Sequence, residues 1–145
     1  MGLRQAAQIP DALKAEPIRA IFVSPLVRTQ LTAEPLAAAS GLEAQVMEGL
    51  QEIEAGRLEK LSDRESVHRY LETVFAWGGG DLDVRMPGGP DGHDFFERFD
   101  ANIAAIAASV ANSSGASAAV FSHGAAIRVW AARRTTNVPP EFAGL

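Results

Sequence analysis

The sequence of 145 residues contains no cysteine. This absence excludes disulfide bonds, thiolate nucleophiles and cysteine-ligated metal sites. The sequence also has no apolar run close to the roughly 20 residues that a membrane-spanning helix needs. Its N-terminus lacks both the basic start and the apolar core of a signal peptide. We therefore expect a cytoplasmic protein that has no membrane partner.

Positive charge is also scarce, because 13 lysine and arginine residues stand against 18 aspartate and glutamate residues, giving a net charge of −5. This balance disfavours a nucleic-acid-binding surface, although it is compatible with a local basic pocket. The composition is 47% hydrophobic and 21% charged, as in ordinary globular proteins. A chain of this length is expected to form a single domain, over 1–145.

Strand and helix patterns alternate along the chain. The β-branched run Ile18–Val23 and the apolar run Ala118–Phe121 predict buried strands, and residues 44–50 form a weaker candidate strand. Helices are predicted over 2–14, 25–40 and 125–134, with Pro10 expected to kink or shorten the first of these. Such alternation favours an α/β fold, a three-layer α/β/α sandwich with a mainly parallel sheet.

Two further helices are predicted from apolar faces at helical spacing. One carries Val67, Tyr70, Leu71, Val74 and Phe75 on one face, and the other carries Phe95, Phe96, Phe99, Ile103, Ile106 and Val110. The glycine-rich and proline-rich stretch "WGGGDLDVRMPGGPDG" between them is expected to be a loop. At the helix that follows the first strand, Ser24 is predicted to be the N-cap, Pro25 the first helical residue, and Gly41 the stop signal.

Two junctions between a strand and a helix have similar sequences, "IFVSPLVR" and "VFSHGAAIR". In a parallel sheet both junctions lie at the carboxyl edge, where open α/β folds bind ligands. Arg28 falls in the first turn of one helix, and His123 comes just before the other. An arginine, a histidine and two helix N-termini would suit a phosphate group. The alternatives are a solvated arginine on a helix surface and a histidine that merely caps a helix.

Four motifs occur in a fixed order over nearly the whole chain. They read "VSPLVRTQLTAEPL" over 23–36, "LQEIEAGRLE" over 50–59, "PGG" at Pro87–Gly89 before a long helix, and "SHG" at Ser122–Gly124. Together they resemble the signatures of the histidine phosphatase superfamily, also called the phosphoglycerate mutase-like family. The order of four motifs makes the resemblance specific, whereas "SHG" alone is common by chance.

The resemblance implies roles for four residues. Arg28 matches the arginine that clamps the transferring phosphoryl group, and Glu52 matches the family's proton donor. His123 matches the second histidine, which stabilises phosphoryl charge without being phosphorylated, and Gly124 lets the backbone approach the phosphate. Glu54 and Glu59 are rivals of Glu52 that solvation of a loop also explains. The expected ligand is a small phosphorylated substrate or inorganic phosphate, and no metal or cofactor is expected.

The chain departs from the family pattern in lacking the "R-H-G" triplet that holds the nucleophilic histidine. His68 lies in a predicted helix and His93 at a boundary between a loop and a helix, so neither matches that triplet. The start "MGLRQAAQ" resembles a segment that lies well inside the family's domain, and the family usually adds a helix and a strand after the last residues here. We therefore expect an incomplete domain, explained by a start codon assigned too late, a shortened chain or a degenerate gene.

The complete domain is expected to be a phosphomonoester hydrolase that works through a phosphohistidine, and this chain is expected to be inactive as given. A mutase is the first alternative, but the long insertion of cofactor-dependent mutases does not fit the 34 residues, 53–86, between Glu52 and Pro87. The other alternative is a non-catalytic relative that binds phosphorylated ligands or a partner protein. Exposed strand edges would also favour pairing between copies, so a homodimer is an open expectation.

Overall fold

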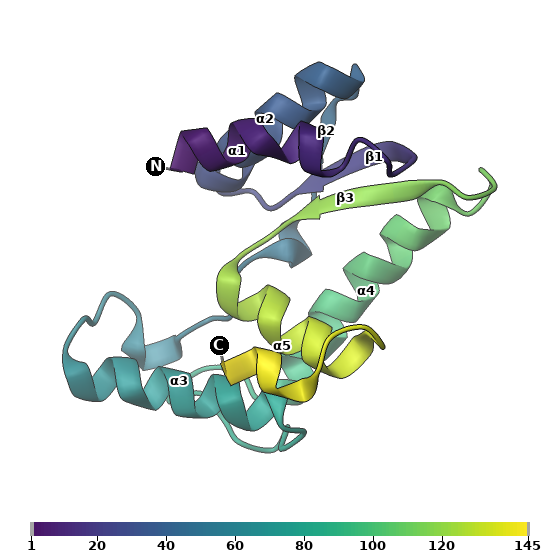
Figure 1. Cartoon of the computed structure of the whole chain (residues 1–145). Helices are drawn as coiled ribbons and strands as arrows, with labels where there is room; N and C mark the ends of the chain where they lie inside the picture. Colours follow the sequence, from purple (N-terminus) through teal and green to yellow (C-terminus); the bar gives the residue numbers. More distant parts are fainter. Residues whose placement is uncertain (1, 145) are drawn as a thin grey trace. The chain divides into compact units, whose positions relative to one another are not determined.

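A computed structural model describes residues 2–144, and for residues 143 and 144 it describes the backbone alone (Figure 1). The elements follow one another as α1 (Gly2–Ala12), β1 (Ile18–Val23), α2 (Val27–Ser40), β2 (Ala44–Val46), α3 (Arg64–Gly78), α4 (Gly92–Val110), β3 (Ser117–Phe121) and α5 (Gly124–Arg134), with short 3-10 turns at η1 (Glu48–Leu50), η2 (Gly56–Leu58) and η3 (Pro140–Gly144). The chain forms two compact units. The first runs to Gln51 and resumes over Asp100–His123, and the second holds Glu52–Phe99 and the residues from Gly124 onward.

The first unit contains a parallel three-stranded sheet in the order β2-β1-β3. β1 lies in the centre because its run of β-branched and aromatic residues is apolar on both faces of the strand. β1 pairs with β2 from Ile21 opposite Ala44 and with β3 from Ile18 opposite Ser117, with an irregularity in register near Ala20. The predicted α/β class with a parallel sheet is therefore confirmed, and all three strands end at the same edge.

Helices cover both faces of this sheet within the first unit. α1 and α2 pack on one face over a core of Ile21, Val23, Ala33, Leu36 and Ala119. Because side chains alternate along a strand, Phe22 points to the opposite face. Figure 1 shows α4 on the side of the sheet away from α1 and α2, and both Phe22 and Ile106 of α4 are buried. The three layers of the predicted sandwich are thus present in this unit.

The predicted ends of α2 were right at one terminus and wrong at the other. Gly41 caps the C-terminus in the left-handed conformation at φ 68°, and its N–H donates to the Ala37 carbonyl. The N-cap, however, is Leu26 and not Ser24, so Pro25 lies outside the helix. The Ser24 side chain has other partners, which are described below. Pro10 is accommodated inside α1, which ends two residues later.

The second unit is built around an aromatic cluster contributed by α3, α4 and α5. The ring centroids of Trp77 and Phe95 are 6.0 Å apart, and those of Phe99 and Trp130 are 5.9 Å apart. The Trp77 indole N–H also donates to the Val84 carbonyl at 2.7 Å. The predicted apolar face of α4 is confirmed at its aromatic positions, because Phe95, Phe96 and Phe99 are all buried.

The predicted buried face of α3 was right at Val74 and wrong at three other positions. Val67, Leu71 and Phe75 are 44%, 39% and 43% exposed, whereas Val74 and Trp77 are buried. The stripe that packs inward runs through Val74 and Trp77. Trp77 determines which stripe is buried because it has the largest apolar surface on the helix and finds an acceptor for its N–H. The sequence reading had assigned Trp77 to the following loop.

No helix among the residues that the structure describes is both long enough and apolar enough to cross a membrane.

The N-terminus of α3 provides a pH-dependent test of the fold. The Asp63 carboxylate accepts hydrogen bonds from the Ser66 N–H at 3.0 Å and the Ser66 hydroxyl at 2.7 Å, and these bonds hold the pKa of Asp63 below its ordinary value of 3.8. A carboxyl group whose pKa is lowered by folding stabilises the fold above its unfolded pKa. This contribution is lost as the pH falls through the folded value. Asp63→Ala should therefore lower the melting temperature near neutral pH and have little effect in strong acid.

Asp81→Ala is the matched control, because Asp81 is exposed and no hydrogen bond of its carboxylate is recorded in the structure. Thermal unfolding followed by circular dichroism at the two pH values measures the difference. Equal destabilisation by Asp63→Ala at both pH values would contradict the capping role.

Candidate functional site

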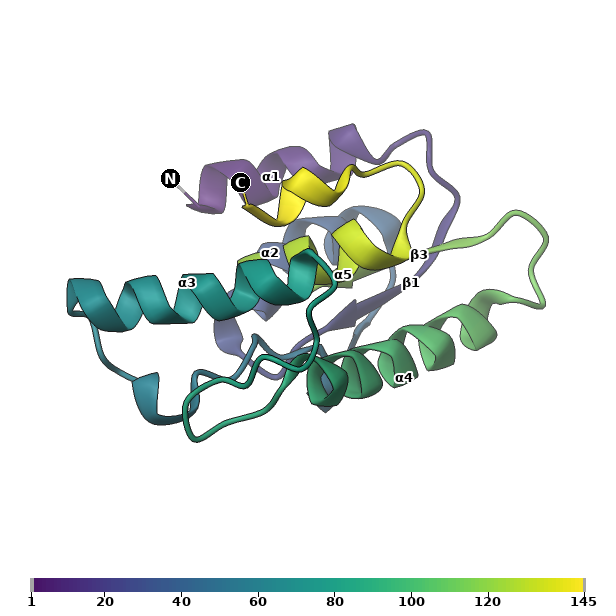
Figure 2. The same cartoon turned by 90° about the horizontal axis from the view of Figure 1, so that it is seen from below.

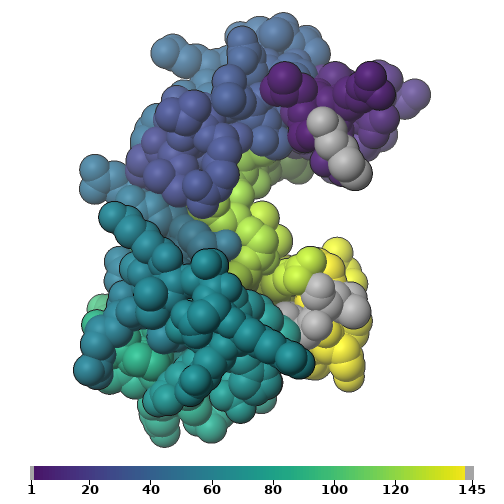
Figure 3. Space-filling model, turned by 90° about the vertical axis from the view of Figure 1, so that its left-hand side faces the viewer, coloured from purple at the N-terminus to yellow at the C-terminus, as the bar shows by residue number. Residues whose placement is uncertain are grey.

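The structure brings Arg28 and His123 together at the carboxyl edge of the sheet. A guanidinium nitrogen of Arg28, Nη2, lies 2.9 Å from His123 Nδ1. Arg28 reaches this position from the first turn of α2, which follows β1, and His123 comes two residues after β3. Figure 3 faces the ends of the strands, and the indigo surface of the start of α2 adjoins the yellow-green surface at the end of β3. The predicted pairing of the two strand-to-helix junctions is therefore present within the first unit.

Ser24 fixes the position of His123. The Ser24 hydroxyl oxygen lies 2.8 Å from His123 Nε2, and both side chains are buried. The same oxygen lies 2.9 Å from Thr29 Oγ1 and accepts from the Leu26 N–H at 3.3 Å. Since no buried polar side-chain atom in the described part of the chain lacks a partner, this network holds the imidazole ring in one orientation.

The partners of His123 also determine which ring nitrogen carries the proton. A guanidinium group has N–H donors and no acceptor. His123 Nδ1 must therefore accept from Arg28, and the ring proton of the neutral imidazole is on Nε2, which donates to Ser24. Ser24 in turn donates to Thr29, whose hydroxyl donates to the Leu26 carbonyl at 2.7 Å. Every proton in this chain of hydrogen bonds has an acceptor.

The Arg28 side chain is exposed, and its contact with His123 uses one of its five N–H groups. The first N–H groups of α2, at Val27 and Arg28, have no acceptor among residues 2–144. Several donors thus face the same edge of the first unit, and such an arrangement suits the oxygens of an anion.

Glu52 belongs to the second unit, where it caps the first turn of α5. Its carboxylate accepts from the Ala126 N–H at 2.8 Å, from the Ala125 N–H at 3.2 Å and from the Ile53 N–H at 3.0 Å. A carboxylate is favoured at a helix N-terminus because it satisfies free N–H groups and interacts well with the helix dipole. The family resemblance implied that Glu52 is a proton donor. Nothing in the local sequence indicated that it caps a helix far along the chain.

This contact corrects the expectation that the N-termini of both helices are open to a phosphate. The N–H groups of Ala125 and Ala126 are occupied by Glu52, so α5 is already matched with an anion. Gly124, the first residue of α5, is exposed, and a Cβ atom added there would meet no atom within 4 Å. Packing in this structure therefore does not require glycine at this position.

Arg98 and Tyr70 hold the main chain on either side of the Glu52–Ile53 bond. Arg98 donates to the Glu52 carbonyl at 3.2 Å, and its guanidinium lies over the Phe95 ring at 5.5 Å. Tyr70 donates to the Ile53 carbonyl at 3.4 Å. Burial, followed by the charges of Glu52 and Glu59, raises the pKa of Tyr70 well above its ordinary value, so the phenol stays a donor. Burial lowers the pKa of Arg98, while Glu54 and Glu52 oppose that change.

Two of the sequence motifs are joined in the second unit. The Arg57 N–H donates to the Pro87 carbonyl at 2.7 Å. Gly56 adopts φ 55°, and a Cβ atom there would collide with the same carbonyl. The glycine of the "LQEIEAGRLE" motif is therefore required by the close approach of the "PGG" segment.

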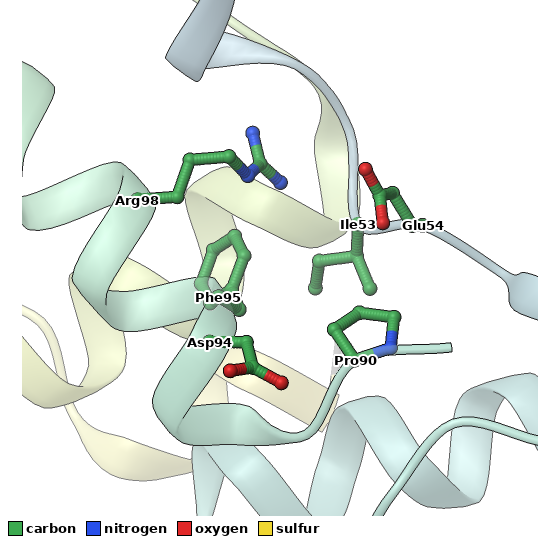
Figure 4. Close-up of a pocket in the computed structure, with 6 residues that line it drawn as sticks. All are labelled: Ile53, Glu54, Pro90, Asp94, Phe95 and Arg98. Atoms are coloured by element: carbon green, nitrogen blue, oxygen red, sulfur yellow. The ribbon is translucent and has the colours of Figure 1, made fainter. Parts of the chain in front are cut away.

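A small pocket beside Arg98 is shown in Figure 4. Its volume is about 190 Å³, and it is lined by Ile53, Glu54, Pro90, Asp94, Phe95 and Arg98. Two of its charged groups already have protein partners, since Arg98 donates to the Glu52 carbonyl and the Asp94 carboxylate accepts from the Asp91 N–H at 3.0 Å. Of these contacts, the one made by Arg98 holds the Glu52 segment.

The remaining candidates lie elsewhere in the second unit. Glu59 accepts from the Ala55 N–H at 3.2 Å, and Glu54 lines the pocket beside Arg98. His68 is exposed on α3 near Glu72, and His93 is exposed at the start of α4, with its Nε2 atom 2.9 Å from Asp83. In the described part of the chain, no group of three or more histidine, aspartate or glutamate side chains could hold a metal ion.

The capping role of Glu52 can be tested by substitution. Glu52→Ala would leave the N–H groups of Ala125 and Ala126 without an acceptor, and leaving buried donors unsatisfied costs about 1–3 kcal/mol. We expect this loss in the free energy of unfolding, together with faster amide exchange at Ala125 and Ala126. Glu52→Gln keeps one acceptor oxygen and should lose less.

Glu97→Ala is the control, because Glu97 is an exposed glutamate of the same unit. Denaturant unfolding gives the free energies, and hydrogen exchange measured by NMR gives the local effect. Unchanged exchange at both alanines in Glu52→Ala would show that the cap is not formed in solution.

A family model described as the histidine phosphatase superfamily, branch 1, matches residues 1–144. The chain belongs to this superfamily. The resemblance drawn from the four motifs is thereby confirmed for the family and for the fold.

Several members of known structure have a similar fold. A mycobacterial glucosyl-3-phosphoglycerate phosphatase with inorganic phosphate superimposes with a TM-score of 0.74 at 23% identity, over 99% of this chain and 71% of that one. The α-ribazole phosphatase of Shigella flexneri gives a TM-score of 0.65 at 21% identity, over 98% and 68% of the two chains. At these identities the likeness concerns the fold.

One curated relative is closer in sequence. A PE-PGRS family protein of Mycobacterium tuberculosis is 43% identical over 95 residues, which are 63% of this chain and 16% of that protein. The histidine phosphatase chain described here thus corresponds to a small part of that much longer relative.

Sequence reasoning did not identify Ser24, Thr29, Arg98 and Tyr70 as residues that position the site. Ser24 was interpreted as a helix cap because serine before proline is a typical helix start. No local signal in the sequence indicates its contact with His123, which lies 99 positions further along the chain. Arg98 and Tyr70 left no such signal either, because each lies on a helix and contacts a segment distant in sequence.

Proposed function

We propose that this chain provides the phosphate-binding part of a phosphomonoester hydrolase of the histidine phosphatase type. The observation that carries the proposal is the Arg28–His123 pair, which is held by Ser24 where β1 and β3 end. In this role Arg28 clamps the phosphate oxygens, and His123 stabilises the negative charge that phosphoryl transfer spreads over them. Phosphatases among the structural neighbours, one of them with inorganic phosphate, support the choice of ligand.

We assign the role of proton donor to Glu52 and the role of close backbone approach to Gly124. Glu52 has a fixed main chain, because Arg98 and Tyr70 hold the carbonyls of residues 52 and 53. A general acid contributes about 10²–10⁴-fold to a rate, and in this role Glu52 would exchange its hydrogen bonds with the Ala125 and Ala126 N–H groups for one with the leaving oxygen of the substrate. The open space around Gly124 supports its role, since a glycine without a packing requirement is consistent with the approach of a ligand.

His123 accepts a hydrogen bond from Arg28. When a phosphate group binds, it competes for that guanidinium, because an anionic oxygen is a stronger acceptor than a neutral imidazole. Phosphate binding is therefore expected to change the environment of the His123 ring.

The phosphate site can be tested by titration. We expect inorganic phosphate to bind with a dissociation constant in the millimolar range, a binding free energy of about 4 kcal/mol. Hydrogen bonds to charged groups contribute about 1.5–3 kcal/mol each. Arg28→Ala should therefore weaken binding at least tenfold. Chemical shifts of the His123 ring and of the Val27 and Arg28 amides, followed by NMR, measure the effect.

Arg19→Ala is the matched control, because Arg19 is an exposed arginine of the same unit that donates to the Ile18 carbonyl. His68→Ala and His93→Ala should also leave binding unchanged. Loss of binding in His93→Ala, with binding retained in Arg28→Ala, would place the phosphate elsewhere and refute the proposed site.

A second candidate function is phosphate binding without catalysis. It is favoured by the positions of the other two histidines, since His68 lies in the middle of α3 and His93 starts α4. Neither follows a strand, as the nucleophile implied by the family resemblance would. This chain is therefore proposed to form no phosphohistidine on its own.

Incubation with a chromogenic aryl phosphate tests this second proposal. We expect no steady hydrolysis and no acid-labile phosphoprotein in the intact mass. Steady hydrolysis that accompanies a phosphoprotein, with both lost in His68→Ala or in His93→Ala, would instead identify a nucleophile within the chain.

A further inference from the structure

The first half of α2 carries apolar side chains on the face that it turns to solvent. Val27 and Leu31 are 68% and 47% exposed, and Leu26, the N-cap residue, is 37% exposed. The inner side of the same turns holds a polar residue, Thr29, which is buried. A surface helix normally has the opposite pattern, with its polar residues outside. Three adjacent exposed apolar residues therefore need another explanation than the packing of the first unit.

The core contacts of α2 come from a different stripe of the helix. Ala33 and Leu36 belong to the core cluster of the first unit, and α2 lies beside α1, which it contacts (Figures 1 and 2). At 3.6 residues per turn, Val27 and Leu31 lie on the opposite side of the helix from Ala33 and Leu36. The exposed apolar side chains thus have no part in holding α2 on the sheet.

The exposed apolar residues are next to Arg28 on the helix surface. Residues three and four positions apart are neighbours on a helix, so Leu31 adjoins both Arg28 and Val27. Helical side chains also lean toward the N-terminus, which places the Leu31 side chain over the first turn. The apolar patch, formed by Leu26, Val27 and Leu31, therefore borders the arginine that contacts His123. Figure 3 shows the surface at the start of α2 open to the viewer beside the end of β3.

We propose that the apolar patch binds the alcohol part of the phosphomonoester, and that the site therefore favours esters of aromatic or alkyl alcohols over esters of sugars. The inference rests on the proposed function, because the phosphate group is the anchor. The N–H groups of Val27 and Arg28 have no acceptor in the described part of the chain, and they belong to the turn that carries the patch. A phosphate held there by Arg28 presents its ester oxygen to the side chains of the same turn.

The charges around the apolar patch favour an uncharged alcohol part. Among residues 26–33, Arg28 is the only one with a charged side chain, and the phosphate group engages it. Glu34 is exposed one turn beyond Leu31. Its carboxylate repels a second anionic group on a ligand that extends along the helix. An ester with a carboxylate in its alcohol part therefore gains no affinity from the patch.

Titrations with three ligands test this preference. Inorganic phosphate measures the phosphate site alone, glycerol 3-phosphate adds a polar alcohol, and phenyl phosphate adds an aromatic ring of similar size. Burial of roughly 60 Å² of apolar surface strengthens binding about tenfold. We therefore expect phenyl phosphate to bind about tenfold more tightly than glycerol 3-phosphate. Chemical shifts of the Val27 and Arg28 amides, followed by NMR, give the dissociation constants.

Leu31→Gln removes part of the patch and keeps a good helix former of similar size. It should reduce the preference for phenyl phosphate over glycerol 3-phosphate at least threefold and leave the affinity for inorganic phosphate unchanged. Val27→Thr, which keeps the main-chain N–H and the branched shape, should also reduce the preference.

Ala38→Gln is the matched control, because it places the same side chain on the same exposed face of α2, two turns beyond Leu31. Leu61→Gln is a second control, since it removes a leucine of the second unit that is exposed to a similar extent, 51%. Both controls should retain the full preference for phenyl phosphate.

The outcomes separate this inference from the proposed function. Binding of phosphate that depends on Arg28, with equal affinity for the two esters or with the full preference retained in Leu31→Gln, overturns the inference alone. Failure of all three ligands to bind overturns the proposed function and the inference with it. A changed oligomeric state of Leu31→Gln in light scattering, with the ligand preference intact, assigns the patch to contacts between copies and also overturns the inference. If Leu31→Gln alters the circular dichroism spectrum, the preference measured in Val27→Thr decides the question.

Discussion

The hydrogen bond between Ser24 and His123 joins the ends of two parallel strands, and the geometry of the first unit's site depends on it. Because both side chains are buried, neither can exchange its partner for water without a free-energy cost. Arg28 sets the tautomer of the ring, because a guanidinium group only donates and Nδ1 must accept, so Nε2 carries the proton that is donated to Ser24. A hydroxyl group in a strand-to-helix turn thus orients a histidine that lies 99 positions further along the chain.

In the second unit, too, hydrogen bonds hold together segments that are distant in sequence. Glu52 caps α5, Arg98 and Tyr70 hold its main chain, and Gly56 permits the contact with the "PGG" segment. Each contact satisfies a main-chain donor or acceptor that a loop would otherwise leave without a partner. The motifs of the histidine phosphatase superfamily therefore stabilise irregular backbone segments as well as placing polar side chains.

Local sequence was sufficient for the central strand, for the stop at Gly41, for the aromatic face of α4 and for the pairing of Arg28 with His123, because each follows from neighbouring residues or from the common edge of parallel strands. The tertiary structure decided the rest. Trp77 determines which face of α3 is buried. Ser24 forms a hydrogen bond with His123 and does not cap α2, and Glu52 caps the N-terminus of α5. These outcomes depend on which distant donor or acceptor each side chain meets, and a linear pattern of apolar and polar residues does not contain that information.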